Sequence, residues 1–370
     1  MDQKNAYAKS GVDTEAGDKA VELMKQSVKA TLSAKVIDGA GGFAGMFDIS
    51  DAKSMKAPVL ATSTDGVGTK VDIARRIDKH DTIGFDLVGM VVDDIAVTGA
   101  KPLMMTDYIS CGKLVPERIA AIVDGIAKAC LEADTALVGG ETAEHPGLLA
   151  PDEYDVAGAA VGIIDKEDIL GPARVKVGDV IVALASSGLH SNGYSLVRKV
   201  FSDAGFDYGQ SVPDFAGEGF SGVPTLGEVL LRPTKIYSAL CLELAKRLDV
   251  HTFSHITGGG IAPNLARVLP VGALGVVQRS SWEMPHIFRF VQEVGGLTQN
   301  DLDETLNLGI GMLVVLPANE AEVCINIAEA AGTKAWLCGE VIHDDPNISD
   351  LSVRAVRGTK GVEAGAAIIA

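Results

Sequence analysis

The pattern of apolar and polar positions predicts a regular alternation of helices and strands. Apolar residues three or four apart indicate amphipathic helices, and short apolar runs between turn-forming residues indicate buried strands. Helices are expected over Glu15–Thr31, Asp86–Val97, Ile261–Leu269, Pro285–Val294 and Ala318–Ala331, and from Pro116, Tyr194 and Pro233 onward. Strands are expected over Pro58–Thr62, Leu103–Ile109, Thr135–Val138, Val156–Ile164, Val180–Ala185, His251–Ile256, Val276-Val277, Ile310–Leu316 and Ala335–Ile342. This order is typical of an α/β protein of the α+β type.

The length of 370 residues favours two α/β domains, because chains of this size rarely build a single core. The charged stretch Asp165–Gly178 contains Gly171-Pro172, and we place the domain boundary there. The N-terminal domain then covers 1–170 and the C-terminal domain covers 171–345. The remaining segment, 346–370, changes from Asp-Pro turns to alanine and glycine, and we expect a poorly ordered or lightly packed tail.

Composition excludes several classes of protein. The chain carries 32 Lys and Arg against 49 Asp and Glu, a net charge of −17, which argues against nucleic acid as the main partner. No run reaches the roughly 18 apolar residues of a membrane span, and the N-terminus lacks an apolar signal core. The five cysteines form no C-x-x-C pair, which argues against zinc and against a disulfide framework. We therefore expect a cytoplasmic protein without a membrane partner.

The stretch Ser63–Lys70 directly follows a predicted strand and combines two glycines, a carboxylate and a Thr-Lys ending. Glycines let backbone amides approach an anion while a carboxylate holds a cation beside it, so we hypothesise a nucleotide-phosphate site. The order differs from the G-x-x-x-x-G-K-[ST] order of a Walker A loop. An ordinary strand-to-helix turn is the alternative interpretation.

Two carboxylates interrupt a predicted helix that is otherwise mostly apolar. Asp86 and Asp93 lie seven positions apart and hence on one helix face. Burial of a carboxylate is costly without a partner, and a hard cation with oxygen ligands is a suitable partner. We therefore expect a magnesium ion that bridges to phosphates.

Four further turns are rich in glycine. Ile37–Gly45 is either a lid that orders over a ligand or a solvent loop, because glycine alone distinguishes neither. Gly139–Gly147 places the adjacent pair Gly139-Gly140 and two acids at the carboxyl end of a strand, where α/β folds bind ligands. Ser186–Tyr194 and Thr257–Gly260 each join a strand to a helix and present backbone N–H groups, which suits an anion site.

Together these segments resemble the phosphoribosylformylglycinamidine cyclo-ligase family, the aminoimidazole ribonucleotide synthetases of purine biosynthesis. Any one motif is weak, whereas seven motifs in the same order are specific, and the resemblance runs from about Tyr7 to His343. The segments that carry it are Tyr7 with Ser10–Asp13, Gly39–Gly45, Asp65–Lys70, Asp94-Ile95 before Gly99–Pro102, Gly139–Glu144, Ser186–Tyr194 and Thr257–Gly260.

The resemblance implies an ATP- and Mg2+-dependent ring closure of formylglycinamidine ribonucleotide. The resemblance implies that the γ-phosphoryl group passes to the formyl oxygen, that the ribose-bearing amidine nitrogen attacks the activated carbon, and that phosphate leaves. Such chemistry requires positioning and charge neutralisation more than a protein nucleophile. The resemblance also implies a homodimer in which the N-terminal halves pair into a shared β-barrel, and a C-terminal half built as a mixed sheet flanked by helices.

The resemblance further implies roles for individual residues. For metal and phosphate binding they are Asp65, Asp94 and Glu141, with Asp93 beside them, and Lys70 and Lys25 for the phosphates. Gly41, Gly42, Gly66, Gly68 and Thr69 line the triphosphate; Ser191 and Asn192 contact substrate; Gly258 and Gly259 offer amides to the ribose phosphate. The candidate catalytic residues are His190, Asp94 and Lys70. His190 is a candidate for proton transfer because imidazole titrates near neutrality. A packing histidine is the alternative interpretation.

The chain departs from the family at Asp93, where we expect asparagine. This carboxylate loses the amide donor and changes the charge beside Asp94. Related ATP-binding enzymes share the acidic and glycine-rich segments, and a small-molecule kinase similar to thiamine-phosphate kinase is the nearest alternative. A nucleotide-binding regulator without turnover is a second alternative, from a different class.

Overall fold

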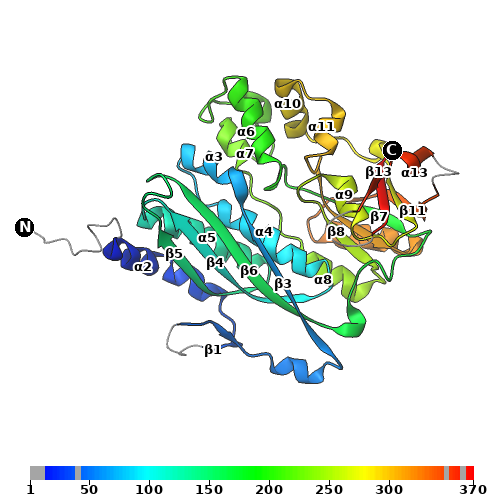
Figure 1. Cartoon of the computed structure of the whole chain (residues 1–370), viewed down its shortest axis with the longest axis horizontal. Coiled ribbons are helices and arrows are strands. Elements are labelled where there is room, and N and C mark those ends of the chain that lie inside the picture. The colour runs from blue at the N-terminus through cyan, green and yellow to red at the C-terminus, as the bar shows by residue number, and fades with distance from the viewer. Residues whose placement is uncertain (1–12, 38–42, 346–349, 359–363) are drawn as a thin grey trace, which may run out of the picture. The chain divides into compact units, whose positions relative to one another are not determined.

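The computed structural model describes residues 13–37, 43–345, 350–358 and 364–370. The chain divides into two compact units (Figure 1). Unit 1 comprises Met1–Ile95, Pro102–Ile163 and Asp207–Ile236; unit 2 comprises Ala96–Lys101, Ile164–Phe206 and Tyr237–Ala370. The segment Asp207–Ile236 therefore belongs to the first unit, whereas the sequence pattern led us to place it in the second domain.

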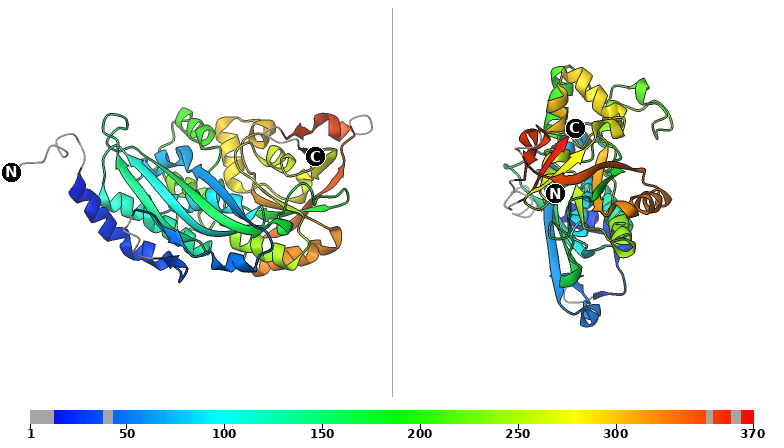
Figure 2. Two further views of the ribbon diagram at one scale, coloured as in Figure 1. Left: turned by 60° about the horizontal axis from the view of Figure 1, so that its bottom comes forward. Right: turned by 90° about the vertical axis from the view of Figure 1, so that its right-hand side faces the viewer.

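A four-stranded sheet forms the centre of unit 1, in the order β3-β6-β4-β5. Side chains alternate between buried and more exposed positions along β6, because successive residues of a strand face opposite sides of the sheet. The helices α4 and α5 cover the buried face (Figures 1 and 2). The strand bounds are β3 (Pro58–Gly66), β4 (Lys101–Cys111), β5 (Ala136–Glu144) and β6 (Tyr154–Asp165).

The helix α2 is amphipathic and packs against α5. Asp13 caps α2, because its Oδ1 accepts a hydrogen bond from the Ala16 backbone N–H. The Ser27 hydroxyl donates to Asp124 of α5 over 2.7 Å, and the Leu137 N–H of β5 donates to Thr31 Oγ1 over 3.0 Å. The helices and short strands of unit 1 are α2 (Thr14–Thr31), β1 (Val36–Ile37), β2 (Met46–Phe47), α3 (Val71–Arg76), α4 (Ile83–Ala96), α5 (Pro116–Glu132) and α7 (Leu226–Leu230).

Unit 2 contains a seven-stranded mixed sheet in the order β12-β13-β9-β11-β7-β10-β8. All seven residues of β10 are buried, which explains the continuous apolar run in the sequence. Its strands are β7 (Val180–Ala185), β8 (Thr252–His255), β9 (Ala273–Val277), β10 (Ile310–Leu316), β11 (Ala335–His343), β12 (Val356–Arg357) and β13 (Ala366–Ile369). Its helices are α6 (Tyr194–Asp203), α8 (Ser238–Arg247), α9 (Ile261–Ala266), α10 (His286–Gly295), α11 (Gln299–Asp303), α12 (Ala321–Ala330) and α13 (Asp350–Arg354).

The prediction of a loosely packed tail is wrong for the end of the chain. The strand β13 pairs in parallel with β9, and the side chains of Ala366 and Ala367 are fully buried. Small side chains let β13 lie close to α9, so alanine here indicates tight packing rather than disorder.

In the described part of the chain, every helix is too short or too polar to cross a bilayer.

Candidate functional site

A cavity of about 590 Å³ lies in unit 1 between α2, α5, β4 and β5. Volumes of roughly 300–1,000 Å³ are typical of small-molecule sites. Apolar side chains make up most of the cavity wall, and the β5 segment from Gly139 to Thr142 forms one side. The apolar lining residues are Ala20, Val21, Met24, Val28, Leu32, Leu114, Val123 and Leu137.

Two residues predicted to bind the nucleotide, Lys25 and Glu141, line this one cavity. Lys25 lies on the exposed side of α2, and its ammonium group is 3.4 Å from Glu22 Oε2. Glu144 links β5 to two segments beside the cavity. Its two oxygens accept the backbone N–H groups of Asp13 and Leu114 over 2.6 and 2.7 Å. The glycine-rich strand end and the N-terminal helix thus meet at one site.

Asp107 also lines the cavity, and the sequence analysis missed it. Asp107 is 9% exposed as a residue, and burial raises the pKa of its carboxyl group to about 7. Asp107 pairs in register with Gly140, where an added Cβ atom would lie 2.3 Å from Asp107 Oδ1. The signal was a lone acid at an inward position of an apolar strand, between buried Met105 and Ile109.

Two of the acidic residues expected to bind metal, Asp65 and Glu141, lie on opposite edge strands of one sheet. Asp65 is exposed near the end of β3, and Glu141 is exposed on β5. These strands are the two edges of the sheet, separated by β6 and β4, or about 14 Å at the usual strand spacing. Asp93 is fully buried and Asp94 is partly exposed, both in α4. Among the described residues, no three His, Cys, Asp or Glu side chains form a group that could hold a metal ion.

The partner of Asp86 is a lysine rather than a cation from solution, which corrects our expectation for this helix. Lys70 Nζ donates to Asp86 Oδ1 over 2.7 Å and to the Arg232 carbonyl over 2.8 Å, and the side chains of Lys70 and Asp86 are fully buried. The Thr234 N–H and hydroxyl also donate to Asp86 Oδ1. Burial lowers the pKa of Lys70 and raises that of Asp86, and the attraction between the pair opposes both shifts. The expected contact of Lys70 with phosphate stays a prediction that this geometry does not support.

The segment from Asp65 to Thr69 begins at the end of β3 and continues into the turn before α3. The strand β3 extends to Gly66, so Asp65 lies in a strand and not in the expected turn. Gly68 has a φ of +73°, which favours glycine, and Thr69 is exposed. An added Cβ atom at Gly66 would lie 3.1 Å from the Val156 carbonyl oxygen. Gly41 and Gly42 lie outside the described residues.

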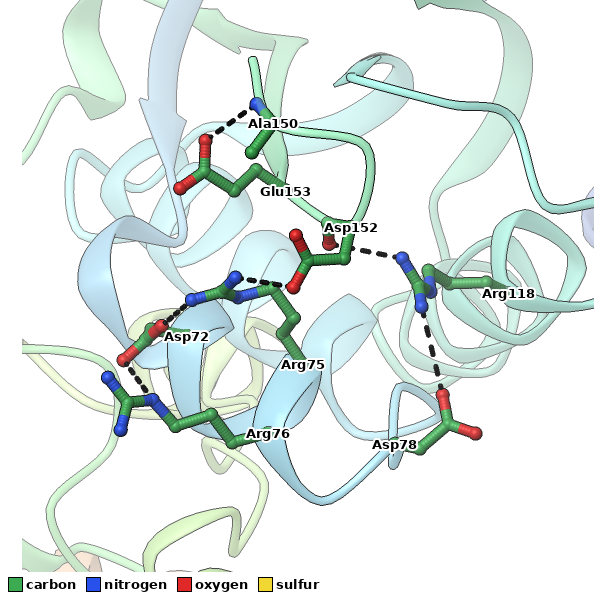
Figure 3. Close-up of polar contacts among 8 residues, drawn as sticks. All are labelled: Asp72, Arg75, Arg76, Asp78, Arg118, Ala150, Asp152 and Glu153. Atoms are coloured by element: carbon green, nitrogen blue, oxygen red, sulfur yellow. Dashed lines mark hydrogen bonds and ion pairs between the residues drawn. The ribbon is translucent and has the colours of Figure 1, made fainter.

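Charged contacts hold the helix α3, which follows this segment, against the rest of unit 1 (Figure 3). Arg75 pairs with Asp72 in its own helix and with Asp152, the latter over 2.6 Å. Arg118 of α5 donates to the Asp152 carbonyl over 3.1 Å, and its guanidinium lies 3.9 Å from Asp78. This network joins α3, α5 and the loop that precedes β6.

The residues expected to bind the ribonucleotide lie in unit 2. Asn192 lies beside Gly258, because an added Cβ atom on that glycine would be 3.4 Å from Asn192 Oδ1. Asn264 holds the turn, since its amide group donates to the carbonyls of Gly258 and Gly260. The neighbouring Gly259 has a φ of +97°.

His190 is almost fully buried in unit 2, with a φ of +60°. Its Nε2 atom accepts the Ser187 backbone N–H over 3.1 Å, so this nitrogen carries no proton. The ring lies near Tyr237, and the following residue, Ser191, is also buried. The imidazole therefore stabilises its own loop, as the packing interpretation expects, and its role in proton transfer stays a prediction.

Comparison with known families covers both units. Residues 46–164 match the AIR synthase related protein N-terminal domain, and residues 176–350 match the C-terminal domain of the same family. The phosphoribosylformylglycinamidine cyclo-ligase of Alkaliphilus oremlandii is 47% identical over 340 residues, 92% of this chain and 98% of the relative. The enzyme of the same name from Lachnospira eligens is 46% identical over 336 residues, 90% of this chain and 96% of the relative.

Solved structures share the fold at lower sequence identity. Thiamine-monophosphate kinase from Stenotrophomonas maltophilia has a TM-score of 0.64 at 18% identity, covering 87% of this chain and 93% of the other. Hydrogenase maturation protein HypE in complex with ATP has a TM-score of 0.59 at 19% identity, covering 90% and 88%. At such identities the likeness concerns the fold alone. With both domain models matched and 47% identity along nearly its whole length, the chain belongs to the phosphoribosylformylglycinamidine cyclo-ligase family.

Proposed function

We propose that the chain is an ATP-dependent carbon–nitrogen ligase of cytoplasmic purine biosynthesis. It converts formylglycinamidine ribonucleotide to aminoimidazole ribonucleotide and releases ADP and phosphate. The observation that carries the proposal is 46–48% identity to enzymes named for this reaction, along nearly their full length. The cavity beside Lys25 and the Gly139–Thr142 segment supports ATP as the cosubstrate, because its volume and partly apolar wall suit a nucleotide.

In the proposed reaction the formyl oxygen attacks the γ-phosphorus of ATP, and ADP leaves. The ribose-bearing amidine nitrogen then attacks the activated carbon, the ring closes with loss of a proton from nitrogen, and the former formyl oxygen departs with phosphate. These steps depend on orientation and charge neutralisation. Lys25 supplies positive charge next to the cavity, and Gly258 and Gly259 supply backbone amides for the ribose phosphate.

We infer that the functional unit is a homodimer. Asp65 and Glu141 occupy opposite edge strands of one sheet, and the described residues of one chain contain no group of three acidic, His or Cys side chains that could hold a metal ion. Strand edges and an open sheet face favour association with a second chain. On that face Leu60 is 61% exposed and Tyr108 is 42% exposed. Pairing of two sheets would bring Asp65 of one chain towards Glu141 of the partner subunit.

The deciding experiment combines the purified chain with ATP, Mg2+ and formylglycinamidine ribonucleotide, and measures aminoimidazole ribonucleotide. We expect product and free phosphate in equal amounts. Thiamine phosphate is the control substrate, and its phosphorylation without any ring closure would favour the kinase alternative. ATP binding without turnover of either substrate would favour the regulator. Asp94→Ala should lose turnover, and near-normal turnover by this variant would remove Asp94 from the proposed site.

A further inference from the structure

We propose that Asp107 reads the base of the bound nucleotide and selects adenine over guanine. This inference rests on the proposed use of ATP and goes beyond it, because it names the residue that recognises the base. The carboxyl group would accept a hydrogen bond from the exocyclic amine of adenine and donate one to ring nitrogen N1. Asp107 is thus a specificity-determining residue, and it takes no part in the chemical steps.

The position of Asp107 matches this role. Its carboxyl group lies on the helix-facing side of β4, nine-tenths buried, and lines a cavity whose other wall residues are mostly apolar. Flat apolar walls suit a heterocyclic base, which needs few polar contacts at defined points. Across the described residues, Asp107 makes no ion pair and its carboxylate accepts a hydrogen bond only from its own backbone N–H. A buried carboxyl group with unused hydrogen-bonding capacity is a ready ligand contact.

The glycine pair of β5 makes room for this carboxyl group. A side chain at Gly140 would lie 2.3 Å from Asp107 Oδ1, whereas a side chain at Gly139 would meet only the Thr106 methyl group at 3.9 Å. The second glycine is therefore required by Asp107 and not by the backbone, since neither glycine has a positive φ. The glycine pair thus leaves space for the Asp107 carboxyl group, and Asp107 is part of the cavity wall.

The surroundings of Asp107 favour its neutral form. Burial is the largest influence on its pKa, which lies at about 7. The titratable groups around it are the exposed Lys25 and Lys29 of α2, Glu141 of β5 and the buried Cys130 thiol of α5. The negative charge of Asp107 adds to the effect of burial in raising the pKa of Cys130. The two lysines lie on the exposed side of α2.

The protonation state decides which base fits. A neutral carboxyl group offers one donor and one acceptor, as the N6 and N1 edge of adenine requires. An ionised carboxylate offers acceptors alone, which suit the N1–H and N2–H groups of guanine. Asparagine reproduces the neutral carboxyl group with a fixed donor and a fixed acceptor. The proposal therefore makes different predictions for Asp107→Asn and Asp107→Ala.

The test measures dissociation constants for ATP and GTP by calorimetry, on the full-length protein without the amidine substrate. We expect Asp107→Asn to keep ATP affinity within about threefold, and Asp107→Ala to lose about tenfold or more while GTP affinity changes little. Between pH 6 and pH 8 the ATP affinity of the wild type should fall relative to that of Asp107→Asn. Asp18→Asn, which changes an exposed acid of α2, is the matched control and should behave as the wild type.

If Asp107→Ala binds ATP and GTP with the same affinities as the wild type and has the same melting temperature, the proposal is overturned. Should Asp107→Ala fail to fold, the pH dependence of ATP affinity still tests the proposal. The same pH dependence in the wild type and in Asp107→Asn would overturn the proposal as well. The ring-closure assay is separate from these measurements. Base selectivity without ring closure would refute the cyclo-ligase assignment alone, and ring closure without any effect at Asp107 would refute base reading alone.

Discussion

The Nζ atom of Lys70 lies 2.7 Å from Oδ1 of Asp86, and both side chains are fully removed from solvent. The pair connects the start of α3 to α4, and the Thr234 hydroxyl and N–H complete the contacts of that oxygen. The lysine of the Asp65–Lys70 motif thus stabilises the junction of α3 and α4 inside unit 1.

Lys70→Met should destabilise the protein by about 3–5 kcal/mol, because it leaves Asp86 buried without its cation. Urea unfolding midpoints measure the change. Lys199→Met is the matched control, since Lys199 and Asp203 form a pair of exposed side chains 2.6 Å apart. Its effect should stay below about 1 kcal/mol. Similar losses in both variants would contradict the structural role of Lys70.

The adjacent glycines of β5 should respond differently to alanine. Gly140→Ala forces a methyl group against the Asp107 carboxyl group and should cost about 1–3 kcal/mol as well as ATP affinity. Gly139→Ala meets ordinary contact distances and should leave both quantities near the wild-type values. Thermal unfolding and the KM for ATP report the two effects, and an equal response of the two glycines would refute this packing.

Asp107 should make the ligand-free protein less stable as pH rises. Its pKa is about 7 in the folded chain and near 4 when unfolded, so the folded state binds more protons in that interval. The stabilisation is fully present below pH 4 and is lost as pH rises through 7. Unfolding free energies of wild type and Asp107→Asn should therefore diverge between pH 4 and pH 8 in favour of the variant. Parallel stability curves for the two proteins would show that the pKa of Asp107 is not raised in the folded chain.

Subunit mixing tests whether two chains complete one acidic site. Asp65→Ala and Glu141→Ala should each be inactive as homodimers. If each site takes one acid from each chain, a mixed dimer contains one intact site, and random mixing restores about a quarter of wild-type activity. Activity that stays absent after unfolding and refolding the mixture would show that both acids act from the same chain. Mixing each variant with itself is the control.

The terminal strand can be tested with two apolar residues of similar chemistry. Ile368 of β13 is 8% exposed and packs in the unit 2 core, whereas Val356 of β12 is 42% exposed. Ile368→Ala should destabilise by about 2–4 kcal/mol, and Val356→Ala should change stability by less than about 0.5 kcal/mol. If Ile368→Ala leaves the melting temperature unchanged, the end of the chain is loosely packed.

Local sequence patterns were enough to predict most elements of the fold. The strands β7 and β10 have the predicted bounds, and α2 differs from its prediction by one residue, because side-chain periodicity follows directly from local geometry. Glycine hid the true length of β5, since Gly139 and Gly140 signal a turn locally but continue the strand here. Alanine likewise hid β13, because small residues reveal packing only when the neighbouring helix is known.

The site depended on contacts between distant parts of the chain. The family resemblance implied Lys25 and Glu141, which the fold brings to one cavity, and it implied Asn192 and Gly258, which lie together in unit 2. Three relationships became visible only in the folded chain: Lys70 neutralises Asp86, Asp65 and Glu141 lie on opposite edges of a sheet, and Asp107 faces a cavity. Burial and charge pairing depend on which segments meet in space, and the residues next to a position in the chain do not encode that.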